Sequence, residues 1–248
     1  MFSVDFLAAR CLTHDMTEPN RAAGSPVLGE IERDDVSRRV LEHVERHMEG
    51  DAAHDLSHLL RVAEWTVRIA GVQVPRRLCI TAALLHDVVN LPKNHPDRAI
   101  ASERSADVAR SVLSDLGMPS ADVELVAEAI RDHSFTRGVV PESLFGKALQ
   151  DADRLEALGV IGTFRCIATG VRFDAQFFDP VDPWAVNRAL DDKRFSVDHF
   201  FTKLLLLPAT FHTAMGRTEA ERRAAFMRRL LLELGTELDR PFAMVDGT

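Results

Sequence analysis

A histidine and an aspartate, His86 and Asp87, stand next to each other in an apolar run, TAALLHDVV. Such a run belongs in the protein interior, where an ionised carboxylate or an unpaired imidazole is costly unless a partner compensates it. A bound cation would compensate both groups, and imidazole with carboxylate suits a divalent ion such as Mn, Fe, Co, Ni, Zn or Mg. The stretch therefore predicts a buried metal site.

Further metal ligands are expected on other helices, because two protein ligands rarely hold such an ion. His58 lies in an apolar helical stretch, and His54 precedes it by one turn. Two aspartates, Asp151 and Asp153, stand in the largely apolar segment LQDADRLEALG. Each of them shares one side of the expected helix with apolar residues, so periodicity alone leaves both as candidate ligands.

The elements that must position these side chains are helices. Residues 1–33 contain turn-forming residues and little periodicity, so we expect a weakly structured leader before a helical domain at 34–240. Helical apolar patterns and their flanking breakers predict helices at 35–48, 52–70, 75–89, 97–116, 120–133, 141–158, onward to 173, at 197–207 and at 218–238. The proline-containing stretch 178–196 predicts an ordered surface loop or lid. The expected fold is a single all-α bundle with long loops.

The composition is typical of a cytoplasmic protein that does not bind duplex nucleic acid. Of the 248 residues, 46% are hydrophobic and 27% charged, which supports a sizeable core. The net charge of −8 has the wrong sign for a duplex-binding surface. No apolar run reaches the roughly 20 residues of a membrane span, and the N-terminus lacks a signal-peptide pattern. We expect no membrane partner, while a homodimer stays open.

The ordered set of His58, His86-Asp87 and Asp153 resembles the H…HD…D signature of the HD-domain metal-dependent phosphohydrolases. The segments HDLSHLLRV, LLHDVVNLPK, AIRDHSF, QDADRLEALGVIG and HFFTKLLLL are similar to those of its small stand-alone members. Together they span most of the chain after the leader. The resemblance implies an HD-domain helical bundle that hydrolyses a phosphorylated substrate.

This resemblance also implies a ligand set. It selects Asp153 as the fourth ligand of one divalent ion, with Mn favoured. We then expect His54 to orient a ligand without binding the ion, and Asp151 either to do the same or to have a structural role. His86 and Asp87 are the expected catalytic pair, since the ion polarises a phosphoryl oxygen and lowers the pKa of a bound water. Some HD hydrolases carry an acidic pair shortly after the HD that orients the attacking water. This chain has Asn-Leu there, so that role is not assigned.

Cations are expected beside the ion, because phosphoryl transfer relies on charge neutralisation and positioning. The candidates for holding substrate phosphates are Arg61, Lys93, His133, His199 and Lys203. His199 and Lys203 are four residues apart and share one helix face. His133 has two alternatives, namely a core histidine bonded to a backbone carbonyl or a ligand of a second metal. A solvated side chain is the alternative for each lysine.

The leading functional hypothesis is a metal-dependent phosphohydrolase acting on a small phosphorylated metabolite, most simply a nucleotide. Two reactions compete: release of pyrophosphate from a (deoxy)nucleoside triphosphate, which we favour slightly, and release of phosphate from a monophosphate. A second class is a non-catalytic module that binds metal and nucleotide for signalling. A third is a di-iron oxygenase, which would need additional metal ligands.

Overall fold

The computed structural model describes most of the chain, namely residues 25–47, 56–91, 96–134 and 137–242. These residues form the helices α1 (Pro26–Arg33), α2 (Asp35–His47), α3 (Leu56–Ala70), α4 (Arg76–Leu85), α5 (Ala101–Asp115), α6 (Ser120–Asp132), α7 (Leu144–Leu155), α8 (Gly159–Arg172), α9 (Ser196–Thr202) and α10 (Ala214–Glu237). Short 3₁₀ helices occur at Gly71–Gln73, Pro96–Ile100 and Leu204–Thr210. Within these described ranges, the β pairing is one isolated bridge between Gln176 and Phe195. The all-α expectation is confirmed.

Helix α4 is the centre of the first part of the fold. Every residue from Leu78 to Leu85 is buried, so the helix has no solvent-exposed face there. A helix that is apolar nearly all round must be covered on all sides. Helices α2, α3, α5, α6 and α7 pack around it. The carboxyl end of α4 therefore lies in the interior of the bundle.

Helix α4 ends four residues before the end of the predicted helix 75–89. Its last residue is Leu85, and His86 is the C-cap. The next amides leave the helical pattern: the N–H of Val88 bonds to the Leu85 carbonyl at 3.2 Å, and the N–H of Val89 bonds to Ser105 Oγ on α5 at 3.1 Å. A tertiary hydrogen bond thus replaces the last helical turn. This break places His86 and Asp87 at the helix end.

The predicted leader boundary at residue 33 is wrong for its last part. Residues 26–33 form α1, whose Val27 and Ile31 are 2% and 0% exposed and belong to the core. Pro26 suits the first turn of a helix, where its missing N–H costs nothing. The carboxylate of Glu30 on α1 pairs with Arg76 at the start of α4. Residues 1–24 lie outside the described ranges.

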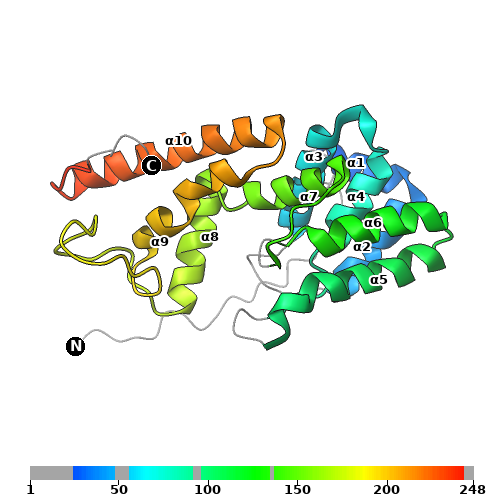
Figure 1. The fold of residues 1–248 in the computed structure, drawn as a ribbon, viewed down its shortest axis with the longest axis horizontal. Coiled ribbons are helices and arrows are strands. Elements are labelled where there is room, and N and C mark those ends of the chain that lie inside the picture. Colours follow the sequence, from blue (N-terminus) through cyan, green and yellow to red (C-terminus); the bar gives the residue numbers. More distant parts are fainter. Residues whose placement is uncertain (1–24, 48–55, 92–95, 135–136, 243–248) are drawn as a thin grey trace, which may run out of the picture.

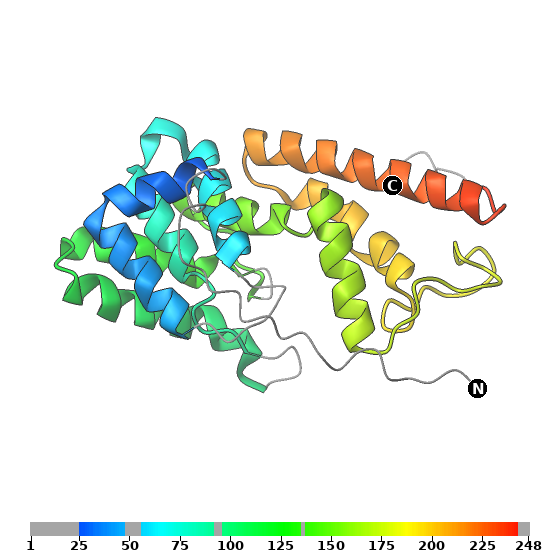
Figure 2. The ribbon, with the colours of Figure 1, turned by 180° about the vertical axis from the view of Figure 1, so that it is seen from behind.

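The helices form two groups, as Figures 1 and 2 show. Helices α1–α6 gather at one end of the molecule, α8–α10 lie at the other, and α7 runs between them. The predicted helix 197–207 is broken, because α9 stops at Thr202 and the next turns are 3₁₀ and include Pro208. Helix α10 begins earlier than predicted, since Thr213 Oγ1 caps it by accepting the Gly216 N–H at 3.0 Å. None of the helices in the described ranges combines the length and apolarity needed to cross a membrane.

The predicted loop at 178–196 is held by its own polar side chains. Asp179 Oδ1 accepts the N–H groups of Val181 and Asp182, each at 2.8 Å. Trp184 donates its indole N–H to the Arg240 carbonyl at 2.8 Å and packs against Phe242. The indole therefore fastens the loop to the residues that follow α10.

Candidate metal centre

Four side chains from three helices converge at the end of α4. The Nε2 atom of His86 lies 3.6 Å from Asp87 Oδ2 and 3.8 Å from Asp153 Oδ1. His58 Nε2 lies 3.7 Å from the same Asp153 oxygen. Ligand atoms held about 2.1 Å from one ion are separated by roughly 3 to 4 Å. These separations therefore fit a shared divalent cation.

The hydrogen bonding of His86 leaves one nitrogen for such an ion. Its Nδ1 donates to the Ala83 carbonyl at 2.7 Å, which fixes the proton on that nitrogen in the neutral ring. Its Nε2 is buried and has no hydrogen-bond partner in the described parts of the chain. A buried ring nitrogen without a hydrogen-bond partner is costly, whether it carries a proton or a lone pair. A cation at the centre of the cluster would satisfy it.

Electrostatics at the same point favours a positive charge. Burial by itself would lower the pKa of His86, but the carboxylates of Asp87 and Asp153 outweigh burial and raise it to about 9. Burial by itself would raise the pKa of Asp153, but the imidazole of His86 outweighs burial and holds it well below its usual range. Without an ion, the pair is an imidazolium with a carboxylate. A divalent ion would take the place of that proton.

His133 joins the cluster from the end of α6. Its Nδ1 donates to the Ile130 carbonyl at 2.6 Å, and its Nε2 lies 3.6 Å from Asp87 Oδ1. The ring stands edge-on to His86 with centroids 4.9 Å apart. The atoms of His86, Asp87 and His133 form a second group of three donors that could hold an ion. The two groups share His86, whose single available nitrogen binds one ion at a time, so we interpret them as one site.

Glu156 was missed by the sequence analysis. It is 1% exposed, and its Oε2 lies 3.3 Å from His58 Nδ1. Arg61 donates to that oxygen from Nε at 2.9 Å. Burial by itself would raise the pKa of Glu156, but hydrogen bonds from His58 and Arg61 outweigh burial and lower that pKa below its usual value. The available signal was spacing, since Glu156 follows Asp153 by three residues as Arg61 follows His58.

The structure distributes the other predicted side chains differently. Arg61, expected to hold substrate phosphate, holds the buried carboxylate of Glu156. His199 pairs with Asp192. His199 is in α9 and Lys203 follows its last residue. In both ribbon views α8 lies between α9 and α4 (Figures 1 and 2). The remaining predicted side chains, those of His54 and Lys93, lie outside the described residues.

Asp151 lies apart from the candidate ligands, on the opposite side of α7. Its carboxylate accepts the N–H of His212 at 3.0 Å, and the N–H and hydroxyl of Thr213 at 2.8 and 2.7 Å. A carboxylate is favoured at a helix N-terminus by the helix dipole. Asp151 therefore fastens the start of α10 to α7. These three hydrogen bonds join Asp151 to His212 and Thr213, and none of them involves the four converging side chains.

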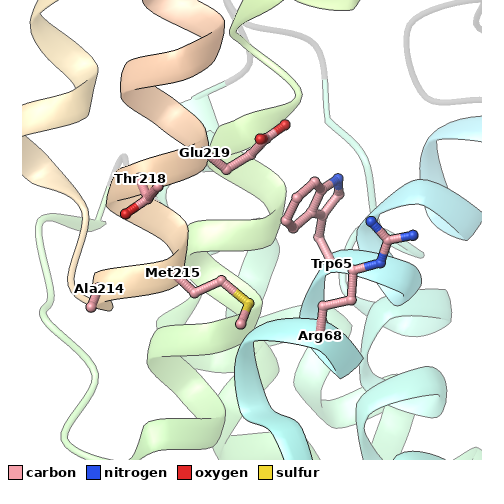
Figure 3. A pocket seen from close by; sticks show the side chains of 6 residues that line it. All are labelled: Trp65, Arg68, Ala214, Met215, Thr218 and Glu219. Carbon is pink, nitrogen blue, oxygen red and sulfur yellow. The ribbon is translucent and has the colours of Figure 1, made fainter.

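A separate groove of about 660 Å³ lies between α3 and α10 (Figure 3). It is lined by Trp65, Arg68, Ala214, Met215, Thr218 and Glu219. None of these belongs to the converging cluster. Arg223 nevertheless links the groove to the neighbourhood of His58, because it lies 5.3 Å from the Trp65 ring and 3.9 Å from Glu156 Oε1.

Comparison with known proteins agrees with the fold and the cluster. Residues 55–158 match the family model of the HD domain, a range that includes all four converging ligand candidates. The uncharacterized protein YpgQ of Bacillus subtilis (strain 168) is 30% identical over 193 residues, covering 75% of this chain and 85% of YpgQ. This chain belongs to the HD-domain superfamily of metal-dependent phosphohydrolases.

Solved structures extend the similarity beyond the HD segment. The crystal structure of YpgQ in complex with ADP has a TM-score of 0.62 at 26% identity, covering 81% of this chain and 96% of that one. An HD-superfamily hydrolase from Bacillus thuringiensis has a TM-score of 0.62 at 28% identity, covering 85% of this chain and 97% of that one. The helices that follow the HD segment are therefore part of the shared architecture.

Proposed function

We propose that this protein is a phosphohydrolase that cleaves a nucleotide with one divalent ion, most simply Mn²⁺, held by His58, His86, Asp87 and Asp153. The observation that carries the proposal is the convergence of two imidazoles and two carboxylates around the buried His86 Nε2. The ADP bound by YpgQ supports a nucleotide as the substrate class. When bound, the ion polarises a phosphoryl oxygen and lowers the pKa of a water.

In this proposal the residues around the ion divide the remaining work. His133 keeps its Nδ1 proton on the Ile130 carbonyl and turns its Nε2 toward Asp87. That nitrogen accepts a proton from the attacking water as the water oxygen bonds to phosphorus. The bond from phosphorus to the leaving oxygen breaks in the same displacement, and solvent returns a proton to the leaving group.

Between the two hydrolytic reactions, we favour release of pyrophosphate from a nucleoside triphosphate. A divalent ion held by these residues would neutralise part of the charge of neighbouring phosphate groups. The di-iron oxygenase is less well supported, because His86 has one nitrogen for metal. A second ion would then be left with Asp87 and His133 among the described residues. The signalling module would share this site but not its turnover.

The test is a product assay. Protein freed of metal and reloaded with Mn²⁺ is offered nucleoside mono-, di- and triphosphates, and phosphate and pyrophosphate are quantified separately. We expect pyrophosphate from triphosphates, no turnover by Asp87→Ala, and near-normal turnover by Lys203→Ala, whose side chain lies by α9. Phosphate release from monophosphates alone would replace the reaction. Metal and nucleotide binding without turnover would instead support the signalling module.

A further inference from the structure

Glu156 is a buried carboxylate that the proposed chemistry does not itself use. It caps the carboxyl end of α7 and is 1% exposed. A buried carboxylate is tolerated when cations and hydrogen bonds compensate its lost hydration. Here three guanidinium groups approach it from three helices. Arg61 on α3 lies at 2.7 Å, Arg165 on α8 at 3.8 Å and Arg223 on α10 at 3.9 Å.

The imidazole of His58 lies between two acidic side chains of α7. Asp153 Oδ1 is 3.7 Å from its Nε2, and Glu156 Oε2 is 3.3 Å from its Nδ1. Asp153 and Glu156 are three residues apart, so both reach the same side of the helix end. A histidine that binds metal through Nε2 carries its proton on Nδ1 and usually donates it to a carboxylate or carbonyl. Glu156 offers that acceptor.

A competing partner stands at the same nitrogen. Arg165 Nη1 lies 3.0 Å from His58 Nδ1. A guanidinium can only donate, so this contact requires a lone pair on Nδ1 and moves the proton of a neutral ring to Nε2. In that form Nε2 cannot bind metal. Glu156 and Arg165 therefore favour opposite tautomers of one ligand.

We propose that Glu156 is a positioning residue for the metal centre, whose carboxylate holds His58 in the tautomer and orientation that bind the ion, with Arg61 fixing the carboxylate. The inference rests on the metal centre under Proposed function. Metal binding selects the Glu156 partner, and Arg165 then turns from His58 toward the carboxylate that it already approaches. Because Arg223 comes from α10 and lies 3.9 Å from the same carboxylate, the second helix group contributes to the position of Glu156.

The experiment compares Glu156→Gln with Arg165→Gln. Both variants replace a charged neighbour of His58 by an amide, and only the first removes the carboxylate acceptor. Mn²⁺ affinity is measured by calorimetry on protein that circular dichroism shows to be folded. Outer partners of metal-bound histidines typically contribute 10–100-fold in affinity. We expect a loss of about tenfold or more in Glu156→Gln and no loss in Arg165→Gln.

A second readout follows the tautomer directly. The ¹⁵N shifts of the His58 ring distinguish a protonated from an unprotonated nitrogen, and diamagnetic Zn²⁺ serves as the probe. We expect Zn²⁺ to leave the proton on Nδ1 in the wild type. In Glu156→Gln without metal, the population with the proton on Nε2 should rise. A purely structural role for Glu156 would lower stability without moving this ratio.

The outcomes separate the two proposals. Wild-type protein that binds neither Mn²⁺ nor Zn²⁺ overturns the metal centre, and the role of Glu156 with it. Wild-type binding with unchanged affinity in Glu156→Gln overturns only the positioning role. Equal losses in both variants would also overturn it, because general packing around His58 would then explain the effect. If Glu156→Gln does not fold, the wild-type ¹⁵N spectrum decides, and a proton on Nε2 with Zn²⁺ present contradicts the inference.

Discussion

Asp151 and Asp153 are two residues apart, yet the structure assigns them to different tasks that matched asparagine variants can separate. Asp151 accepts three hydrogen bonds at the start of α10. Asparagine keeps the shape but offers one acceptor oxygen, so its amide would face either the His212 N–H or the Thr213 donors. Hydrogen bonds to charged groups contribute about 1.5–3 kcal/mol each, and neutral ones about 1 kcal/mol.

For Asp151→Asn, one charge-assisted bond is lost and two become neutral. The expected cost in the free energy of unfolding is about 2.5–7 kcal/mol, a large part of the roughly 5–15 kcal/mol that stabilises a domain. The four proposed metal ligands are untouched. At a free Mn²⁺ concentration of 100 times Kd, the ion should still add about 2.7 kcal/mol to this variant, as to the wild type.

For Asp153→Asn, most of the stability that Mn²⁺ adds should disappear. A ligand lost from the ion weakens binding by at least the roughly 100-fold that outer partners can reach. The same Mn²⁺ concentration would then equal Kd and add about 0.4 kcal/mol. Urea unfolding of each variant, with chelator and with Mn²⁺, measures both quantities. An unchanged metal increment in Asp153→Asn, or its loss in Asp151→Asn, would contradict this assignment of the two aspartates.

Three further predictions follow from single groups. Folding raises the pKa of His86 to about 9 from its ordinary value near 6.5. In the metal-free protein, the stabilisation that His86 contributes should therefore be complete below about pH 6.5 and should be lost as the pH rises through 9. Mn²⁺ bound at His86 would displace the extra proton of its imidazolium, so calorimetry at pH 7.5 in two buffers should show about one proton released per ion. No proton release would contradict His86 as a metal ligand. Burial raises the pKa of the Cys79 thiol to about 12, so a thiol reagent should label it only after unfolding; labelling in the folded protein would contradict its burial. In Gly162→Ala the new Cβ would stand 2.2 Å from the Ala157 carbonyl carbon, and urea unfolding should show a loss of about 3 kcal/mol; wild-type stability would show that α8 can shift.

The ligand cluster was predictable to the extent that it lies in apolar sequence. The apolar run before His86 predicts a buried helix, and α4 is buried along its whole length from Leu78. The choice between Asp151 and Asp153 was not predictable from periodicity, because both sides of α7 are covered. One side meets α3 and the cluster, and the other meets the start of α10.

Other differences arise from tertiary contacts that a local pattern does not contain. Helix α4 stops early because Ser105, distant in sequence, takes the amide of Val89. Helix α1 is only eight residues long, and its signal is the pair Val27 and Ile31 within a proline- and glycine-containing stretch. The sequence around Glu156 predicts an ordinary surface acid, because the three guanidinium groups that approach it come from other helices.

The metal centre is tested most directly by the initial rate of nucleoside triphosphate cleavage by wild type and Asp153→Asn, at equal Mn²⁺ and with bound metal counted for each protein. We expect about one ion per wild-type chain, with turnover that requires it. In the variant, metal and turnover should be lost together while the helical fold is kept. Turnover that persists in Asp153→Asn without bound metal would contradict a metal centre built on these four side chains.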